Sequence, residues 1–509
     1  MTNKKRIAVV GSGLASFGAC SALSEDEKIL VDIYDIGLTK KELFCTNKAV
    51  PNSKLYKGSY FAYGLNDNRW SRKIHSKRIC SSHAWLGFSN VYSGSMLLPK
   101  SDDLSEWPEG SQPKQIDVDH IIDCLELIRG EDDLDYFFNI SSKNEINTND
   151  ERKKDEADLI LGHSRIAITR NVKKSGKEMI TPFKPEGYLK ELIRSSSFNY
   201  IPNCNVLSIK GTKSGNKIIF EKYNTELNQI SHEESRVYDG VLLCAGCINT
   251  TGIVDLSIRS LNNNIDKTTY YSLYSAPIYL QAYLNLSINK SSKHSKIRGS
   301  ELCSHFLEMR SQSTGNTWCH TQLGPINSEI TRQIKSKLPK IIYPIYIWAT
   351  SFIKFSITCY HSNIGIPSLI VCNTKRTNER YIQEMTIREN KNRSPKKAFY
   401  ELFKSVLIKF NELFLIPIPF TSLLSQLLRG NQLGGWHFGG TTPMKERPVE
   451  LSDCYPSGEV FGLPGVYVAD SAGFPSIPGS TIALLIMTNG RRVARDCLKK
   501  IHGSSEKDF

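Results

Sequence analysis

The sequence predicts an α/β fold, α+β overall, with a parallel sheet at its centre and an inserted region of antiparallel strands. Three features predict it: a strand, glycine turn and helix at the start of the chain, a strand and helix near its end, and alternating apolar runs between them. With 509 residues, 40% of them hydrophobic and 23% charged, the chain has globular composition and can form a large core.

The chain is basic, with a formal net charge of 65 − 51 = +14. A basic surface favours anionic partners such as phosphates, acidic lipids or acidic glycans, and a solvated surface with no such partner is the alternative. No dense basic run carries interleaved aromatic residues, so we expect no nucleic-acid partner, and no metal site is expected. Thirteen scattered cysteines favour reduced thiols in a cytoplasmic protein.

The N-terminal segment "KKRIAVVGSGLASFGACSAL" has two interpretations. Its cationic start and apolar middle are typical of a signal peptide, whereas a strand from Arg6 to Val10, a glycine turn and a helix from about Leu14 would begin a βαβ unit. The next run, "KILVDIYD", favours the βαβ unit because it ends in Asp35, 24 residues after Gly11. A Rossmann-like dinucleotide-binding unit requires an acid near this position.

Each residue of this turn has an expected role. Gly11 permits the tight turn, Gly13 lets the backbone approach a pyrophosphate, and the N-terminal N–H groups of the helix point at the phosphates. Asp35 would accept hydrogen bonds from ribose hydroxyls. Ser16 stands where the third glycine of the motif usually lies, followed by Gly18, and a small residue still allows close helix packing. The turn alone does not separate FAD from NAD.

The C-terminal region also contains a predicted strand followed by a loop and a helix. A short strand from Val466 to Ala469 precedes Asp470, a Pro/Gly loop and a helix from about Thr481. The start of a buried helix after such a loop forms a site for an anion or a carbonyl oxygen. Simple packing of a terminal helix on the sheet is the alternative.

Four segments carry a family resemblance, in the order "VVGSGLASFG", "WLGFSNVYSGSMLLPKSDDLSEWP", "VLLCAGCINTTGIV" and "HFGGTTPM" with "VYVADSAGFPSIPGSTIALLIMTNGRRVA". They resemble the FAD fingerprint, the second signature, the A-A-G segment and the C-terminal active-site block of the glucose-methanol-choline (GMC) family of FAD-dependent oxidoreductases. The resemblance spans residues 6 to 498 and is weak from about 110 to 200 and from 260 to 430. Bacterial members associated with sugar and polysaccharide biosynthesis resemble the chain most.

The resemblance implies that His437, on a glycine-rich loop, faces the reactive edge of the flavin. There a neutral imidazole removes the hydroxyl proton as hydride leaves carbon for flavin N5; a loop histidine satisfied by backbone is the alternative. Thr481 stands where the family usually has Asn or His, and threonine is no base at neutral pH. Catalysis then rests on His437 alone, or Thr481 and Thr442 position the hydroxyl.

The resemblance also implies which residues bind FAD outside the N-terminal turn. They are Gly87, Ser89 and Asn90 at the pyrophosphate and flavin, Val206 at the adenine, Ala245 and Gly246 at the adenosine, and Asp470 at the ribityl chain or pyrophosphate. Leu86 replaces the first glycine of the second signature and Tyr92 its usual tryptophan, so we expect an altered loop and non-covalent FAD. Cys244 and Cys247 have the spacing of a redox pair, but in this segment Cys247 is expected to be a packing residue.

The predicted domains are discontinuous. Residues 1–110, 195–256 and 450–509 would form the FAD-binding domain, and residues 111–194 and 257–449 a substrate domain built on an antiparallel sheet. The runs "YYSLYSAPIYLQAYLNLSI" and "KFSITCYHSNIGIPSLIVCNT" alternate as antiparallel strands do.

Two further segments have less specific patterns. The polar stretch 141–158 predicts an exposed loop or a short disordered crossing. The apolar run from Ile341 to Ile353 is too short to span a bilayer. It is either a buried helix lining the substrate pocket or a lip in peripheral contact with a membrane.

The function expected from these features is oxidation of the CH–OH group of a small sugar or sugar-like alcohol by an FAD-dependent dehydrogenase or oxidase. One alternative is an FAD-binding protein with little such activity that acts as a partner or scaffold. Another is an oxidoreductase of steroid or lipid alcohols, which the aromatic-rich insert would suit. His437 favours the enzyme over the scaffold, whereas Thr481, which cannot act as a base, is compatible with the scaffold. The sequence does not identify the electron acceptor.

Overall fold

The structure is a computed structural model that describes residues 4–38, 69–76, 81–90, 92, 94–128, 158–163, 165–172, 178–285, 305–311, 314–325, 353–364, 367–376, 381–388, 415–418 and 437–503. The predicted loop 141–158 and apolar run 341–353 lie outside these residues, except for the last residue of each. No helix among the described residues is long and apolar enough to cross a membrane.

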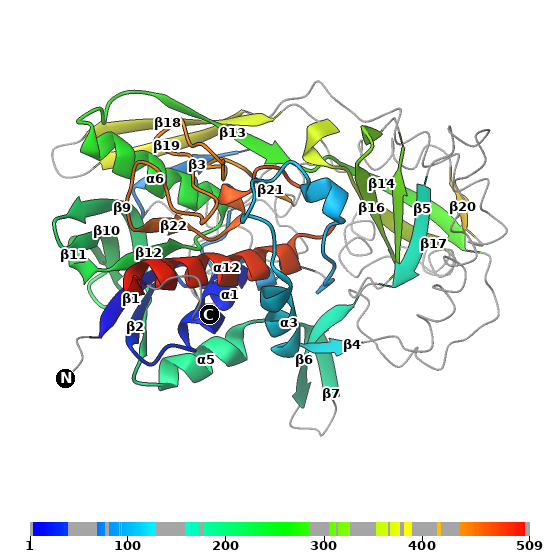
Figure 1. Ribbon diagram of the computed structural model, residues 1–509, viewed down its shortest axis with the longest axis horizontal. Coiled ribbons are helices and arrows are strands. Elements are labelled where there is room, and N and C mark those ends of the chain that lie inside the picture. The colour runs from blue at the N-terminus through cyan, green and yellow to red at the C-terminus, as the bar shows by residue number, and fades with distance from the viewer. Residues whose placement is uncertain are drawn as a thin grey trace.

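A five-stranded parallel sheet forms the centre of the molecule (Figure 1). Its strand order is β22-β12-β1-β2-β8, and all four pairings are parallel. The strands are β22 (Val466–Val468), β12 (Gly240–Leu243), β1 (Lys5–Val10), β2 (Ile29–Tyr34) and β8 (Phe198–Ile201). The two ends and the middle of the chain therefore meet in one sheet, and the predicted fold class is confirmed. The first helix begins at Leu14, as predicted.

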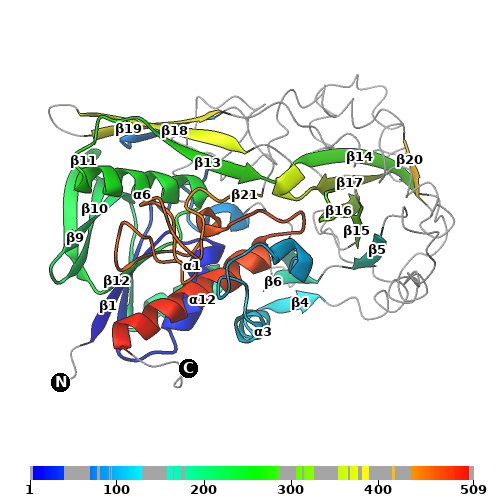
Figure 2. The ribbon, with the colours of Figure 1, turned by 45° about the horizontal axis from the view of Figure 1, so that its top comes forward.

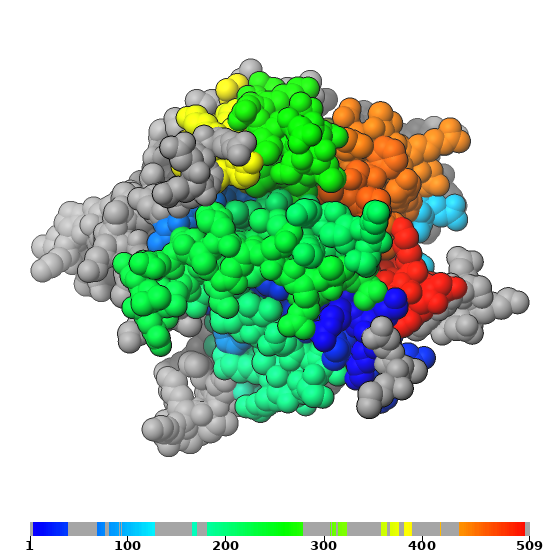
Figure 3. Space-filling view, turned by 90° about the vertical axis from the view of Figure 1, so that its left-hand side faces the viewer, coloured from blue at the N-terminus to red at the C-terminus, as the bar shows by residue number. Residues whose placement is uncertain are grey.

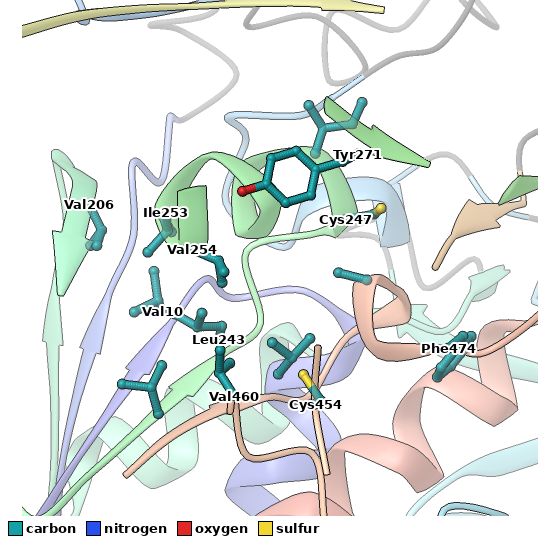
Figure 4. Packing of buried hydrophobic residues seen from close by; sticks show 14 of the residues in the cluster. Val10, Val206, Leu243, Cys247, Ile253, Val254, Tyr271, Cys454, Val460 and Phe474 are labelled. Carbon is teal, nitrogen blue, oxygen red and sulfur yellow. The ribbon is translucent and has the colours of Figure 1, made fainter. Parts of the chain in front are cut away.

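Helices cover both faces of this sheet, which explains the nearly continuous apolar runs of its strands. Ile7 and Val9 face α1 (Leu14–Leu23) and α12 (Ala483–His502), and the alternate residues Ala8 and Val10 face the other side. On that side lies α6 (Cys247–Leu261). Figure 4 shows its residues Val254 and Ile253 above Val10 and Leu243, with Tyr271 on the far side of the helix.

The helices α1 and α12 cross with their backbones in contact. A Cβ atom added at Gly18 would overlap the carbonyl oxygen of Met487, and one added at Gly490 would overlap that of Ala15. Ser16, where the third glycine of the motif was expected, is fully buried, with its hydroxyl 3.8 Å from the Cys20 sulfur of the same helix. Close packing therefore depends on Gly18.

Two mainly antiparallel sheets lie end to end above and beside this layer (Figures 1 and 2). The first has the order β21-β13-β18-β19-β3, made of Phe438–Gly439, Thr269–Ser275, Ser368–Arg376, Tyr381–Arg388 and Arg72–His75. The second has the order β20-β14-β17-β16-β15-β5, made of Leu415–Pro417, Ile278–Asn285, Ile353–Cys359, Trp318–Pro325, His305–Arg310 and Asp158–His163. The predicted antiparallel runs are confirmed.

Both of those runs pass from one sheet into the other. The chain crosses between β13 and β14 at Ala276 and Pro277, and between β17 and β18 after Tyr360. The Tyr360 N–H donates to the Pro277 carbonyl oxygen at 3.0 Å, which ties the two crossings together. We call this place the sheet junction.

Smaller elements complete the described chain. They are the antiparallel strands β9 (Cys204–Thr212), β10 (Gly215–Asn224) and β11 (Gln229–Tyr238), the strands β4 (Glu126–Ile128), β6 (Ile166–Val172) and β7 (Glu178–Pro182), the helices α3 (Gln115–Asp123) and α5 (Glu186–Arg194), and the 3-10 turns η5 (Ser101–Leu104) and η9 (Ser362–Ile364). The green segment that includes β9 to β11 and α6 forms most of the described surface in Figure 3.

A buried polar network fastens α6 to the first antiparallel sheet. Asp255 accepts hydrogen bonds from Arg259 at 2.6 Å, Gln383 at 2.9 Å and Tyr271 at 3.2 Å. Arg72 of β3 donates to the Gln383 side-chain oxygen at 2.8 Å. A buried carboxylate is tolerated when it is paired in this way, so the network holds helix and sheet in one arrangement. The strand β3 joins this sheet although it lies within residues 1–110.

Candidate active site

The first part of the site is the turn between β1 and α1. Gly11 has φ +104°, and its N–H donates to the Tyr34 carbonyl oxygen at 2.7 Å. An added Cβ would overlap the Cys244 carbonyl oxygen, so both conformation and space require glycine here. Gly13 is the N-cap of α1 and offers no side-chain cap. The start of this helix can therefore present its N–H groups to an anion.

The second part is the loop that ends in the 3-10 turn η4 (Gly87–Asn90). Gly87 faces the first turn, because an added Cβ would lie 3.9 Å from the Gly13 Cα. Leu86 has φ +69°, the left-handed conformation that glycine normally adopts. The loop thus keeps a glycine-like backbone where the residue is leucine, at a strain of roughly 1 kcal/mol. The change of residue predicted an altered loop, but the backbone at this position retains the left-handed form.

Ser12 joins these two loops to Asp35. Its hydroxyl accepts a hydrogen bond from the Leu86 N–H at 2.8 Å and donates to the Asp35 carboxylate. The Tyr200 hydroxyl donates to the same carboxylate oxygen at 3.2 Å. Sequence reasoning missed Ser12 because it occupies the variable position of the G-x-G motif.

Asp35 follows β2 directly, where the sequence placed the ribose-binding acid. Burial raises its pKa to about 7, although the hydrogen bonds from Ser12 and Tyr200 lower it. A carboxylate in this state gains stability from further hydrogen-bond donors. Its environment suits the hydroxyl groups of a ribose, and the contact itself stays a prediction.

The polar side chains of the second loop hold its own shape. The Ser89 hydroxyl donates to the Leu86 carbonyl oxygen at 2.8 Å, and the Asn90 amide donates to the Trp85 carbonyl oxygen at 2.8 Å. Lys184 donates to the Asn90 side-chain oxygen at 3.2 Å. Contacts of Ser89 and Asn90 with FAD remain predictions.

The third part lies after β12, where Gly246 (φ +80°) is the N-cap of α6. Asp470 accepts hydrogen bonds from the Gly246 N–H at 2.8 Å, the Thr250 hydroxyl at 2.6 Å and the Ala472 N–H at 2.9 Å. Burial raises the Asp470 pKa to about 6, against these bonds. Its carboxylate organises the starts of α6 and of η10 (Ser471–Gly473). The half-buried Ala245 directly precedes Gly246, and the FAD contacts of this segment stay predictions.

The cysteines of this segment are separate thiols. Cys244 and Cys247 are both free and buried, and burial raises the pKa of each above its ordinary value. The Cys247 sulfur lies 3.6 Å from the Thr441 hydroxyl. A protonated, enclosed thiol is unreactive, so the structure places Cys247 as a packing residue, as expected.

Val206 is the third residue of β9, which continues to Thr212, so it lies near the start of that strand. Its side chain belongs to the core (Figure 4), and its carbonyl oxygen accepts a hydrogen bond from Arg72 at 3.0 Å. The predicted backbone contact with adenine is untested.

His437 lies at the sheet junction. Its carbonyl oxygen accepts a hydrogen bond from the Ala276 N–H at 2.9 Å, and β21 begins directly after it. Its ring nitrogen Nδ1 is buried without a partner among the described residues. Burial, and secondly the charge of His320, lower the His437 pKa to about 4. The ring is therefore neutral at pH 7, the form that accepts a proton.

The loop before α12 reaches the same junction. Ile477 and Ser362 exchange hydrogen bonds, with the Ile477 N–H donating to the Ser362 hydroxyl at 2.9 Å. A Cβ added at Gly479 would lie 2.9 Å from the Cys359 carbonyl oxygen. Thr481, two residues later, is buried, and within the described chain its hydroxyl has no partner. The helix itself begins at Ala483, two residues after the predicted start.

Sequence reasoning missed His320 and Glu308. They face each other across β16 and β15, and His320 Nδ1 lies 3.0 Å from the Glu308 carboxylate. His320 is also the strand partner of Cys359, which contacts Gly479. No motif covers these strands, and only their pairing brings the two residues together.

The parts of the site fit FAD. The strands β1 and β12 are neighbours, and the chain leaves them for helices on opposite faces of the sheet. Such a switch point opens a crevice at the carboxyl ends of parallel strands, where dinucleotides bind. Asp35 stands at the end of the adjacent strand β2, and the unpartnered atoms of His437 and Thr481 suit the reacting end. Within the described residues, no group of His, Cys, Asp or Glu side chains could hold a metal ion.

Comparison with known proteins agrees with this architecture. Residues 406–490 match the family described as GMC oxidoreductase. No curated protein matches the sequence.

Solved structures of similar fold include three oxidoreductases. An FAD-dependent oxidoreductase from Chaetomium thermophilum is 13% identical, with 98% of this chain and 100% of that chain covered and a TM-score of 0.58. A formate oxidase is 12% identical, with coverage of 99% and 100% and a TM-score of 0.60. Pyridoxine 4-oxidase from Mesorbium loti is 12% identical, with coverage of 99% and 100% and a TM-score of 0.58. At this identity the likeness shows the fold, and FAD is the cofactor of proteins that carry it.

Proposed function

We propose that this protein is an FAD-dependent oxidoreductase that oxidises the CH–OH group of a sugar or sugar-like alcohol, with His437 as the base. The supporting observation is a neutral imidazole with an unpartnered ring nitrogen, on the segment that matches GMC oxidoreductases. The imidazole lies where that segment meets both antiparallel sheets. A neutral base beside a buried site is what removal of a hydroxyl proton requires.

In this proposal the bound FAD supplies the acceptor for a hydride from the carbinol carbon. His437 accepts the hydroxyl proton, and the Thr481 hydroxyl orients the substrate oxygen by one hydrogen bond. The turn at Gly11 and Gly13, with Asp35, holds the nucleotide part of the cofactor.

We also propose how the chain divides into domains and where the protein is located in the cell. Residues 1–110, 195–256 and 450–509 would bind FAD, and residues 111–194 and 257–449 would shape the substrate pocket. The ten cysteines that the structure describes are all free, which supports a reducing, cytoplasmic setting. Peripheral contact with a membrane remains a proposal from the apolar run 341–353. Thr481 favours a second candidate, an FAD-binding scaffold with little activity.

We expect the purified protein to be yellow and to release FAD, not FMN, on denaturation. The reason is the crevice expected at the switch point, where the Asp35 carboxylate can accept hydrogen bonds from the ribose of a dinucleotide. The visible spectrum and chromatography of the released cofactor measure this. A colourless protein that takes up no FAD on reconstitution would contradict the proposed cofactor. Anaerobic bleaching against sugars, other alcohols, pyridoxine and formate then identifies the substrate class.

Replacing Thr481 with valine should change rate and stability in opposite directions. The lost hydrogen bond to substrate should slow flavin reduction about 2- to 13-fold, equivalent to roughly 0.5–1.5 kcal/mol. The protein should become slightly more stable, because a buried hydroxyl without a protein partner is removed at nearly constant shape.

Anaerobic stopped-flow reduction and thermal unfolding measure the two effects, and Thr481→Asn, which restores the usual family residue, should be tolerated. A Thr481→Val rate as low as that of a His437 variant would reject the single-base mechanism.

A further inference from the structure

Two histidines, not one, lie close to the sheet junction. In the described chain, His437 Nδ1 and His320 Nε2 are both buried without a hydrogen-bond partner. His320 is close enough to His437 to contribute to lowering its pKa. Because an unpaired buried polar atom is costly, two of them near one junction point to a ligand or reacting group there.

The strands fix His320 at this place. β16 pairs with β17 so that His320 lies opposite Cys359, and β17 pairs with β14 so that Cys359 lies opposite Ile278. Two residues before Ile278 is Ala276, whose N–H donates to the His437 carbonyl oxygen at 2.9 Å. Cys359 also contacts the loop that carries Thr481. Both histidines therefore border one small region.

The ring of His320 is held by its surroundings. Phe306 stacks on it, with ring centroids 5.4 Å apart and an angle of 30° between the ring planes. Glu308 lies 3.0 Å from Nδ1, and because a carboxylate only accepts hydrogen bonds, Nδ1 carries the hydrogen. In the neutral ring, Nε2 then has the free lone pair and can accept a proton.

Glu308 is ionised and connects the pair to the surface. Burial raises its pKa, but the hydrogen bond from His320 and the charges of His320 and Lys100 outweigh burial and lower it. The Lys100 ammonium lies 3.5 Å from the second carboxylate oxygen, and its side chain is 42% exposed, against 4% for Glu308. Other charged groups near Glu308 and Lys100 are Asp102, Asp103 and Arg310.

We propose that His320 is a further catalytic residue, which receives at Nε2 the proton that His437 takes from the substrate hydroxyl, while Glu308 positions and compensates its ring. This step rests on the proposed alcohol oxidation. The substrate O–H bond breaks as an N–H bond forms on His437. That bond breaks as an N–H bond forms on His320, directly or through one water. The hydride carries both electrons from the carbinol carbon to FAD, and no electron passes through the histidines.

The chemistry of His437 explains why such a partner is needed. Its low pKa, about 4, makes the ring a neutral base but a poor place for a proton to remain. Thr481 cannot take that proton. His320 offers an acceptor at Nε2, and the Glu308 carboxylate lies 3.0 Å from its other ring nitrogen, where it can offset the charge gained. The pair would thus replace the second polar residue that the C-terminal helix lacks.

The first test is chemical rescue in anaerobic single-turnover reduction. His320→Ala should lower the maximal rate of flavin reduction about 10²-fold with little change in substrate Kd, since the step is a proton transfer. Free imidazole should enter the vacated space and restore part of the rate. Glu308→Gln should also slow reduction, without rescue by imidazole.

His361→Ala is the matched control, because His361 is a buried histidine next to the junction whose ring nitrogens both have partners. Nε2 lies 3.3 Å from the Asp103 carbonyl oxygen, and Nδ1 accepts from the Asn363 N–H at 3.2 Å. Imidazole should not accelerate this variant. Equal rates in His320→Ala and the parent, or a slow His320→Ala that imidazole leaves unchanged, would overturn the proposal.

The second test does not need turnover. NMR titration of the ring nitrogens should show the His437 pKa rising from about 4 in His320→Gln, because a neighbouring positive charge is removed. His361→Gln should leave it unchanged. An unmoved His437 titration in His320→Gln overturns the proposal even if no alcohol reduces the parent protein. Reduction that fails for every alcohol in the parent rejects the proposed function instead.

Discussion

Replacing His437 with alanine should leave FAD bound and slow reduction of the flavin by alcohol about 10²–10⁴-fold, the usual contribution of a positioned base. Binding should persist because the groups expected to hold the nucleotide, Gly11, Gly13 and Asp35, lie around the β1–α1 turn, away from the sheet junction. Stopped-flow reduction under anaerobic conditions measures the rate, and the flavin spectrum measures occupancy.

The pH dependence should identify the base. Because burial lowers the His437 pKa from 6.5 to about 4, the neutral form persists in mildly acidic solution. The value of kcat/KM should therefore fall as pH drops through about 4, and this limb should vanish in the variant. His232→Ala, at an exposed histidine of β11, which belongs to a separate three-stranded sheet, is the control and should match the parent. Equal reduction rates for parent and His437→Ala would exclude His437 as the base.

The sequence was sufficient for the elements whose signals are local. Strand, glycine turn and helix around Gly11 follow from residue chemistry within a short window, because only glycine takes φ +104° beside another backbone. The strand at Val466 and the helix after Thr481 were found for the same reason. The alternating runs at β13, β14, β17 and β18 also show their period directly.

Partners that meet only through strand pairing were not predictable. Glu308 and His320 lie on strands that no motif marks, and their contact exists because β15 and β16 align in one register. A shift of one strand by one residue would put the two side chains on opposite faces of the sheet. Ser12 was missed because the motif leaves its position free, and its role depends on Leu86, 74 residues away.

The backbone at Leu86 shows how residue identity can mislead. A leucine in place of glycine predicted an altered loop, yet the surrounding contacts hold the left-handed form. The Leu86 N–H is bonded to Ser12, and the Ser89 hydroxyl is bonded to the Leu86 carbonyl oxygen. These bonds on both sides of the residue offset its strain.

Gly18 is a second position where a tertiary contact, and not the local motif, determines the expected effect of a substitution on stability. The motif directs attention to Ser16, but the structure places the closest approach of α1 and α12 at Gly18. A methyl group there would overlap the Met487 carbonyl oxygen, which is backbone and cannot turn aside. α12 would have to move, and the loop that carries Thr481 is attached to its start.

Gly18→Ala should therefore destabilise the protein by about 3 kcal/mol or more, at the upper end of overpacking costs. The thermal midpoint of this 509-residue chain should fall by about 3 °C or more, and FAD should dissociate more readily because the α1 N-terminus shifts. Gly187→Ala is the matched control: it makes the same change in α5, where an added Cβ meets no described atom within 4 Å. There alanine favours the helix by up to about 1 kcal/mol, so the midpoint should stay or rise slightly.

If both variants unfold at the parent's temperature, the backbone contact between α1 and α12 is looser than the structure shows. A fall in the thermal midpoint of Gly18→Ala alone would show that stability depends on the absence of a side chain at Gly18. That absence lets α1 and α12 pack closely, and these helices carry the Gly11 turn and the Thr481 loop at their starts.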